Sequence, residues 1–105
     1  MAINKNPNNI LLEGRTDDNL KFTCEADYDI TAYPLSFLVE TNSGVIDLSQ
    51  YCIKTSAIKF TVDVPSSVMA GLEAAVNYKV GVKLDANNRD FFFGGKMIIK
   101  KGILL

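Results

Sequence analysis

The stretch LKFTCEA, residues 20–26, alternates strictly between apolar and polar side chains. Successive side chains of a β-strand point to opposite faces, so this period of two predicts a strand with one dry face and one wet face. IKFTVDV (58–64) and YKVGVKL (78–84) repeat the pattern, which is typical of antiparallel sheets buried on one side. The residues expected to face the core are Leu20, Phe22, Cys24, Ala26, Ile58, Phe60, Val62, Val64, Tyr78, Val80, Val82 and Leu84.

Weaker strand patterns lie between and around these three stretches. They are NILLEG (9–14), LSFLVET (35–41), YCIK (51–54) and the last segment, RDFFFGGKMIIKKGILL (89–105). The intervening segments are rich in Asn, Asp and Gly, which favour turns. They are RTDDN (15–19), NSG (42–44) and DANNRD (85–90). About seven strands at this spacing are typical of a β-sandwich.

One segment departs from the strand pattern. VPSSVMAGLEAAVN (64–77) has a proline, then Ser66 or Ser67 as a candidate N-cap, then apolar residues at helical spacing. It is too short for an independent helix, so it predicts a single helical turn near 66–73 that crosses between sheets. Tyr78 follows it and opens a strand, as a tyrosine does at the corresponding corner of immunoglobulin sandwiches. We therefore expect an all-β, Ig-like antiparallel sandwich of about seven strands over 10–105, preceded by a flexible arm at 1–9.

The composition argues against most kinds of chemistry. The chain of 105 residues carries 12 acidic and 11 basic residues, without the basic excess of a nucleic-acid binder, and its apolar runs are too short to span a membrane. It contains no histidine, which removes Ser–His and Cys–His pairs and His-ligated zinc. Cys24 and Cys52 have no CxxC spacing and are expected to be reduced and buried, with a disulfide as the alternative. No enzyme activity, cofactor or metal is expected.

Acidic turns are the remaining candidates for a metal site. Asp27 with Asp29, and Asp85 with Asp90, have oxygen ligands of the kind that calcium prefers. Neither pair has the spacing of an EF-hand loop. Acidic turn residues more often form Asx-turns, which is the interpretation we favour here.

Three consecutive phenylalanines, Phe91, Phe92 and Phe93, place large apolar groups on both faces of the last predicted strand. One face belongs to the core, and the other requires a covering partner or a loop of the same chain. Aromatic residues are enriched at the centres of protein interfaces, which favours a partner. Gly94–Gly95, directly after them, is expected to form a bulge or a bend. The candidate interface residues are Ile3, Asn4, Phe91, Phe92, Phe93, Ile103, Leu104 and Leu105. The alternative for 103–105 is an extension of the last strand.

The order of these elements resembles the small Ig-like domains of tailed-bacteriophage virion proteins, typified by the N-terminal domain of the baseplate upper protein family. The resemblance rests on four segments in order: LLEGRTDDNLKFTCEA (11–26), GVIDLSQ (44–50), KFTVDVPSSVMAGLEAAVNYKVGVKL (59–84) and DANNRDFFFGGKMIIKKGIL (85–104). It covers about nine-tenths of the chain, and order and spacing carry it rather than any single motif. It implies no catalytic residues.

The resemblance implies a non-enzymatic structural protein of the virion, made in the cytoplasm of a host bacterium. The first expectation is a capsid decoration or cement subunit that binds the major capsid protein in many copies, where multivalency strengthens a modest contact. The alternative is an adaptor that binds tail or baseplate proteins. A third hypothesis is a carbohydrate-binding adhesion module, with Tyr28, Tyr33, Tyr51 and Phe92 as its candidate aromatic residues.

Overall fold

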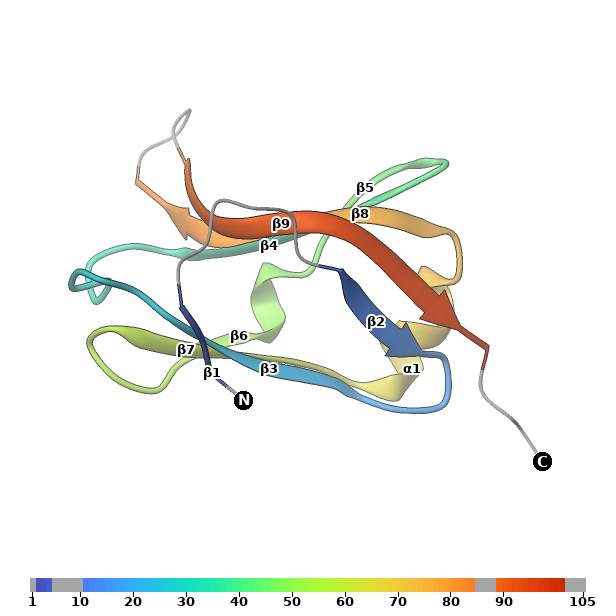
Figure 1. Ribbon diagram of the computed structural model, residues 1–105, viewed down its shortest axis with the longest axis horizontal. Coiled ribbons are helices and arrows are strands. Elements are labelled where there is room, and N and C mark those ends of the chain that lie inside the picture. The colour runs from blue at the N-terminus through green and yellow to red at the C-terminus, as the bar shows by residue number, and fades with distance from the viewer. Residues whose placement is uncertain (1, 5–10, 85–88, 102–105) are drawn as a thin grey trace.

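The computed structural model describes residues 2–4, 11–84 and 89–101, which form two packed β-sheets and one short helix (Figure 1). The elements in chain order are β1 (Ala2–Asn4), β2 (Leu12–Arg15), β3 (Leu20–Glu25), β4 (Leu35–Thr41), β5 (Gly44–Asp47), the 3-10 turn η1 (Ser49–Tyr51), β6 (Cys52–Lys54), β7 (Lys59–Val64), α1 (Ser66–Met69), the 3-10 turn η2 (Ala70–Leu72), β8 (Ala75–Lys83) and β9 (Arg89–Lys100). Within this part of the chain, no helix is long and apolar enough to cross a membrane.

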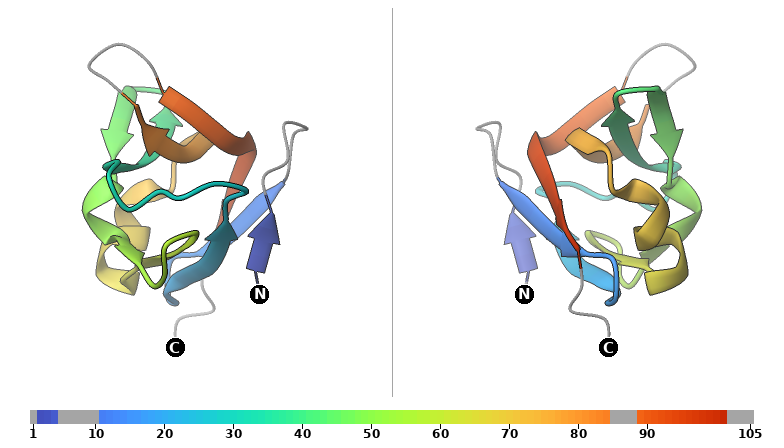
Figure 2. Two further views of the ribbon diagram at one scale, coloured as in Figure 1. Left: turned by 90° about the vertical axis from the view of Figure 1, so that its left-hand side faces the viewer. Right: turned by 90° about the vertical axis from the view of Figure 1, so that its right-hand side faces the viewer.

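The larger sheet has five strands in the order β2-β9-β8-β4-β5. The smaller sheet contains β3, β7 and β6 in antiparallel pairing, and β1 adds to the free edge of β3. Viewed from either end, the two sheets form separate layers, with the helical turn beside them (Figure 2). β1 and β5 were not predicted from the sequence.

The expectation of purely antiparallel sheets is wrong at two strand pairs. β2 runs parallel to β9, and β1 runs parallel to β3. β2 does not pair with β3, because the turn at 16–19 carries the chain across to the facing sheet. β9 is antiparallel to β8 and parallel to β2, so the larger sheet is mixed.

The core lies between the two layers, and the three alternating segments supply ten of its nineteen residues among those that the structure describes. Ten of the twelve residues that were expected to face inward are buried, but Ile58 and Leu84 are each 38% exposed. Those two residues lie just outside β7 and β8, where the opposite sheet no longer covers them. At the centre, the ring of Phe37 meets Phe22 edge-on at 5.8 Å and Tyr78 at 6.2 Å between ring centroids.

The predicted helical turn near 66–73 is confirmed as α1 followed by η2. It joins β7 of the smaller sheet to β8 of the larger sheet, and its Met69 and Leu72 are buried. Its N-terminus differs from the expectation, since Pro65 is the N-cap residue and no serine side chain caps the helix. Instead, the backbone N–H of Ser66 donates to Oδ1 of Asn19, 2.8 Å away, from the turn between β2 and β3.

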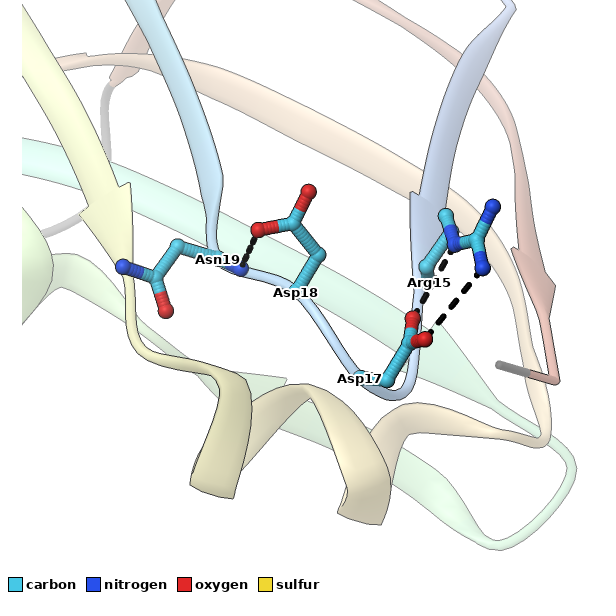
Figure 3. Close-up of polar contacts among 4 residues, drawn as sticks. All are labelled: Arg15, Asp17, Asp18 and Asn19. Carbon is cyan, nitrogen blue, oxygen red and sulfur yellow. Dashed lines mark hydrogen bonds and ion pairs between the residues drawn. The ribbon is translucent and has the colours of Figure 1, made fainter. Parts of the chain in front are cut away.

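That turn is held by local polar contacts (Figure 3). The guanidinium of Arg15 donates to both carboxylate oxygens of Asp17, at 3.0 and 3.2 Å, and the N–H of Asn19 donates to Asp18. The Arg15 hydrogen bond lowers the pKa of Asp17. The pair is exposed, so it contributes little to stability. Its effect is to shape the turn that carries Asn19 to the start of α1.

Candidate functional site

The structure places the candidate interface residues on two different sheets. Ile3 and Asn4 lie in β1 and pair with Cys24 and Glu25 of the smaller sheet, whereas the three phenylalanines lie in β9 of the larger sheet. Ile103, Leu104 and Leu105 lie outside the described residues. The predicted segments therefore do not all converge on one sheet.

A β-bulge explains how three consecutive phenylalanines fit into β9. Phe93 pairs with Val80 and Phe91 pairs with Gly81, so Phe92 is the extra residue between them. The expected bulge at Gly94–Gly95 is wrong, because these glycines pair in regular register with Lys79 and Tyr78 and the bulge lies at Phe92 instead. The bulge shifts the side-chain alternation by one residue, as bulges do. Phe91 lies on the outer face of the sheet, where Nζ of Lys79 is 5.1 Å from its ring centroid.

A groove of about 490 Å³ crosses the outer face of the larger sheet. Its lining comes from β4, β5, β8 and β9: Leu38, Glu40, Val45, Asn77, Tyr78, Lys79, Gly95 and Lys96. The apolar part is formed by Leu38 and by Val45, which is 64% exposed although it belongs to a sheet. We take this groove as the candidate functional site, because it combines exposed apolar surface with charged groups.

Two consecutive glycines lie on the β9 side of the groove. Gly94 is opposite Lys79, and Gly95 is opposite Tyr78, with a φ of 154° at Gly95. Because paired residues share a face, Gly94 lies on the outer face with exposed Lys79, whereas Gly95 lies on the core face with buried Tyr78 and lines the groove through its backbone. The missing side chain of Gly94 therefore leaves the outer surface beside the groove uncovered.

The charged groups around the groove are not evenly balanced. Glu40 is the only acidic side chain in the lining, and its Oε1 accepts a hydrogen bond of 2.6 Å from the amide of Asn77, which positions the carboxylate without removing its charge. Lys79 and Lys96 contribute two ammonium groups, and within the described residues neither forms a salt bridge. The groove therefore offers an apolar floor beside positive charge that is available to a ligand.

The outer face of the smaller sheet is different in character. Lys21 pairs across the strands with Asp63, and Nζ of Lys59 is 3.4 Å from Glu25. The hydroxyls of Thr23 and Thr61 share a hydrogen bond of 3.1 Å. Lys21 and Lys59 thus oppose acidic residues within the sheet, and Nζ of Lys54 in β6 donates to the carbonyl oxygen of Thr31, so this sheet has less to offer an external partner than the groove does.

The titratable groups with the largest shifts are buried ones. Burial raises the pKa of Cys24 strongly, with a smaller effect from Cys52. Burial, and next the nearby Asp47, raise the pKa of Cys52 to about 12. Burial and then Cys24 raise the pKa of Tyr78 to about 12. Both cysteines are free. A thiol reacts as the thiolate, so these two are held in their unreactive form.

The other candidates from the sequence have ordinary structural surroundings. Tyr28 and Tyr33 pack edge-to-face, with an angle of 73° between their rings, and both lie against the core, as does Tyr51. They do not form the flat platform expected of a sugar site.

Oδ1 of Asp29 accepts the N–H of Thr31 at 2.8 Å, as in an Asx-turn. The described ranges contain no group of three or more residues able to hold a metal ion.

Sequence reasoning missed most of the groove. Leu38, Val45, Asn77 and Lys96 come from four strands, and nothing in the sequence links them. The strand β5, which carries Val45, was not predicted, because GVID is short and lacks the alternation of apolar and polar residues that indicates a strand. The pair Gly94–Gly95 was the one available signal, since adjacent glycines in a strand mark places where another chain approaches closely.

Substituting Gly94 by alanine is expected to destabilise the protein by about 1–3 kcal/mol, the usual cost of overpacking. A Cβ at Gly94 would lie 2.8 Å from the carbonyl oxygen of Tyr78 and 3.0 Å from Cγ of Lys79. The carbonyl belongs to a paired strand and cannot move aside. Urea denaturation of Gly94→Ala and of Gly71→Ala measures the effect. Gly71 is the matched control, because a Cβ there meets nothing within 4 Å, and equal stabilities of the two variants would contradict the prediction.

No family model matches the chain, and no curated protein matches its sequence.

Proposed function

We propose that this protein is a non-enzymatic structural subunit of a tailed-bacteriophage virion, and that it acts as a capsid decoration or cement protein bound to the major capsid protein. The observation that carries the proposal is the outer face of the larger sheet. There, an open groove with exposed Val45 and two lysines is available for contact with another protein. The absence of histidine from the sequence agrees with a role in adhesion rather than catalysis.

We further propose that the two packed sheets are an immunoglobulin-like sandwich, as the phage resemblance implies. Immunoglobulin domains place their second, fifth and fourth strands in one sheet and their third, sixth and seventh strands in the other. If β1 and β2 together count as the first strand, the order β3-β7-β6 corresponds to the former sheet. β9, β8 and β4 then correspond to the latter, with β5 as the extra strand of variable-type domains. The helical turn before Tyr78 supports the same assignment.

The alternative within the virion is a tail or baseplate adaptor that binds tail proteins. Both versions use the same surface and differ in symmetry and copy number. The carbohydrate-binding alternative is less well supported, because Tyr28 and Tyr33 lie edge-to-face and partly covered rather than in one exposed plane.

Quantitative mass spectrometry of gradient-purified virions tests the proposal. We expect peptides of this chain to remain with the particles through the gradient, with the major capsid protein as the internal standard. On the order of hundreds of copies per particle would place the chain on the symmetric shell, and roughly a few dozen or fewer would place it in the tail. Particles without the chain would contradict the proposal, as would a glycan array in which the purified protein binds a defined sugar.

A further inference from the structure

The search for a docking partner begins with the unequal charges of the two outer faces. On the smaller sheet, lysines oppose acidic residues in the neighbouring strand, as Lys21 does Asp63 and Lys59 does Glu25. On the larger sheet, Lys100 lies 3.7 Å from Glu13 near one end, but Lys79 and Lys96 border the groove without such a partner among the described residues. Lys83 of β8 also has no salt bridge among the described residues, but it lies opposite Arg89, away from the groove, whereas Lys79 and Lys96 both line the groove.

From this arrangement we infer that the groove binds an extended segment of a partner protein that carries both carboxylates and apolar side chains. The apolar groups of that segment lie on Leu38 and Val45, and its carboxylates lie at Lys79 and Lys96. The inference rests on the proposed function, since it names the chemistry of the surface to which a virion subunit would bind.

Three features of the groove favour an extended chain over a compact small molecule. The groove is open and lies along the exposed surface of four neighbouring strands rather than in an enclosed cavity. The missing side chain of Gly94, which lies on the outer face opposite Lys79, allows the backbone of a ligand to approach β9 closely. The two lysines come from adjacent paired strands, Lys96 being opposite Asn77 and Lys79 opposite Gly94, so they can meet successive acidic side chains.

The carboxylate of Glu40 does not cancel this preference. Its Oε1 accepts the amide of Asn77, which fixes the carboxylate on the β4 side of the groove. The lining still carries two ammonium groups against this one carboxylate, so its net charge is positive. Opposite charges steer association and suppress unsuitable partners, so the groove selects against basic segments.

A titration followed by ¹⁵N–¹H NMR tests the inference with synthetic peptides as probes. The three probes are capped heptapeptides in which serine occupies every second position, and the remaining positions are aspartate and leucine in turn, lysine and leucine in turn, or aspartate alone. In an extended chain the residues at these remaining positions share one face, so each probe presents them together to the groove. We expect the aspartate–leucine peptide to shift the amide signals of Val45, Asn77 and Lys96 and to leave those of Lys21 and Thr61 unchanged. Binding should weaken as salt rises, because exposed charges are screened.

A pair of charge-matched variants separates the groove from net charge. Lys79→Gln/Lys96→Gln is expected to weaken binding of the aspartate–leucine peptide about fivefold or more, the effect of two exposed ion pairs. Lys21→Gln/Lys59→Gln removes the same charge from the other sheet and should leave binding unchanged. Circular dichroism confirms that both variants fold.

Several results would overturn the inference. They are equal binding of the lysine–leucine peptide, equal loss in both double variants, or no shifts at the groove with any peptide. A dimer in analytical ultracentrifugation that Val45→Glu dissociates would also overturn it, because the occupant would then be a second copy of the chain. The two experiments test separate claims. If the chain is found in virions but the groove does not bind the peptides, the proposed function stands and the inference about the groove is wrong. If the groove binds the aspartate–leucine peptide but the chain is absent from virions, the inference about the groove stands and the proposed function is wrong.

Discussion

Raising the pH from about 8 to about 10.5 is expected to lower the free energy of unfolding by roughly 5 kcal/mol, chiefly through two buried thiols. Cys24 is fully buried and Cys52 is partly buried, and burial raises the pKa of both in the folded protein. In the unfolded chain a cysteine ionises near pH 8.5, about where the loss begins. The folded state then binds more protons than the unfolded state, so stability falls as pH rises.

The size of the effect follows from linkage. Each thiol held protonated only in the folded state costs about 1.4 kcal/mol per pH unit above the unfolded pKa, so two thiols over about two units give roughly the stated loss. The loss from Cys52 ends near its folded pKa of about 12. Tyr78, whose pKa is raised to about 12, adds to the decline once pH exceeds the unfolded tyrosine value of about 10.

Urea denaturation at several pH values, under reducing conditions, measures this dependence. The native protein should lose stability steeply above about pH 8.5, and Cys24→Ala should show about half the slope. The comparison uses slopes, so the stability lost by shortening the side chain does not affect it. Constant stability between about pH 8 and 10.5, or an unchanged slope in Cys24→Ala, would contradict the prediction.

Replacing Phe37 by alanine is expected to destabilise the protein by about 3–5 kcal/mol, the usual cost of removing a fully buried aromatic ring. Phe37 is 0% exposed and contacts Phe22 and Tyr78 edge-on, so it joins the two sheets at the centre of the core. The cavity cannot close easily, because its walls are paired strands. Most small domains have only about 5–15 kcal/mol of stability in total, so the variant should be close to unfolding at room temperature.

Phe91→Ala is the matched control for this substitution. Phe91 is only half-buried, on the outer face, and its ring lies under Lys79 rather than in the core. We expect its loss to cost about 1 kcal/mol, in proportion to the smaller apolar area that the ring buries. Chemical denaturation of both variants gives the comparison, and equal costs would show that Phe37 does not hold the sheets together as described.

The strand β9 shows which features could not be predicted from the sequence. The three phenylalanines predict apolar side chains on both faces, but alternation alone leaves open which residue faces which side. One extra residue at Phe92 changes the register, and that bulge depends on pairing with Val80 and Gly81. The glycines that follow attract attention in the sequence, yet their place at the groove depends on which residues lie beside them.

The sequence by itself determined the three alternating strands, most of the core and the helical turn at α1. Each of these follows from a local rule, because the period of hydrophobicity within six or seven residues decides which side chains are buried. Only the tertiary structure decided the parallel pairing of β1 and β2, the exposure of Ile58 and Leu84, and the meeting of Val45, Lys79 and Lys96 around one groove. These features depend on which strands become neighbours, and strand pairing joins residues far apart in the chain.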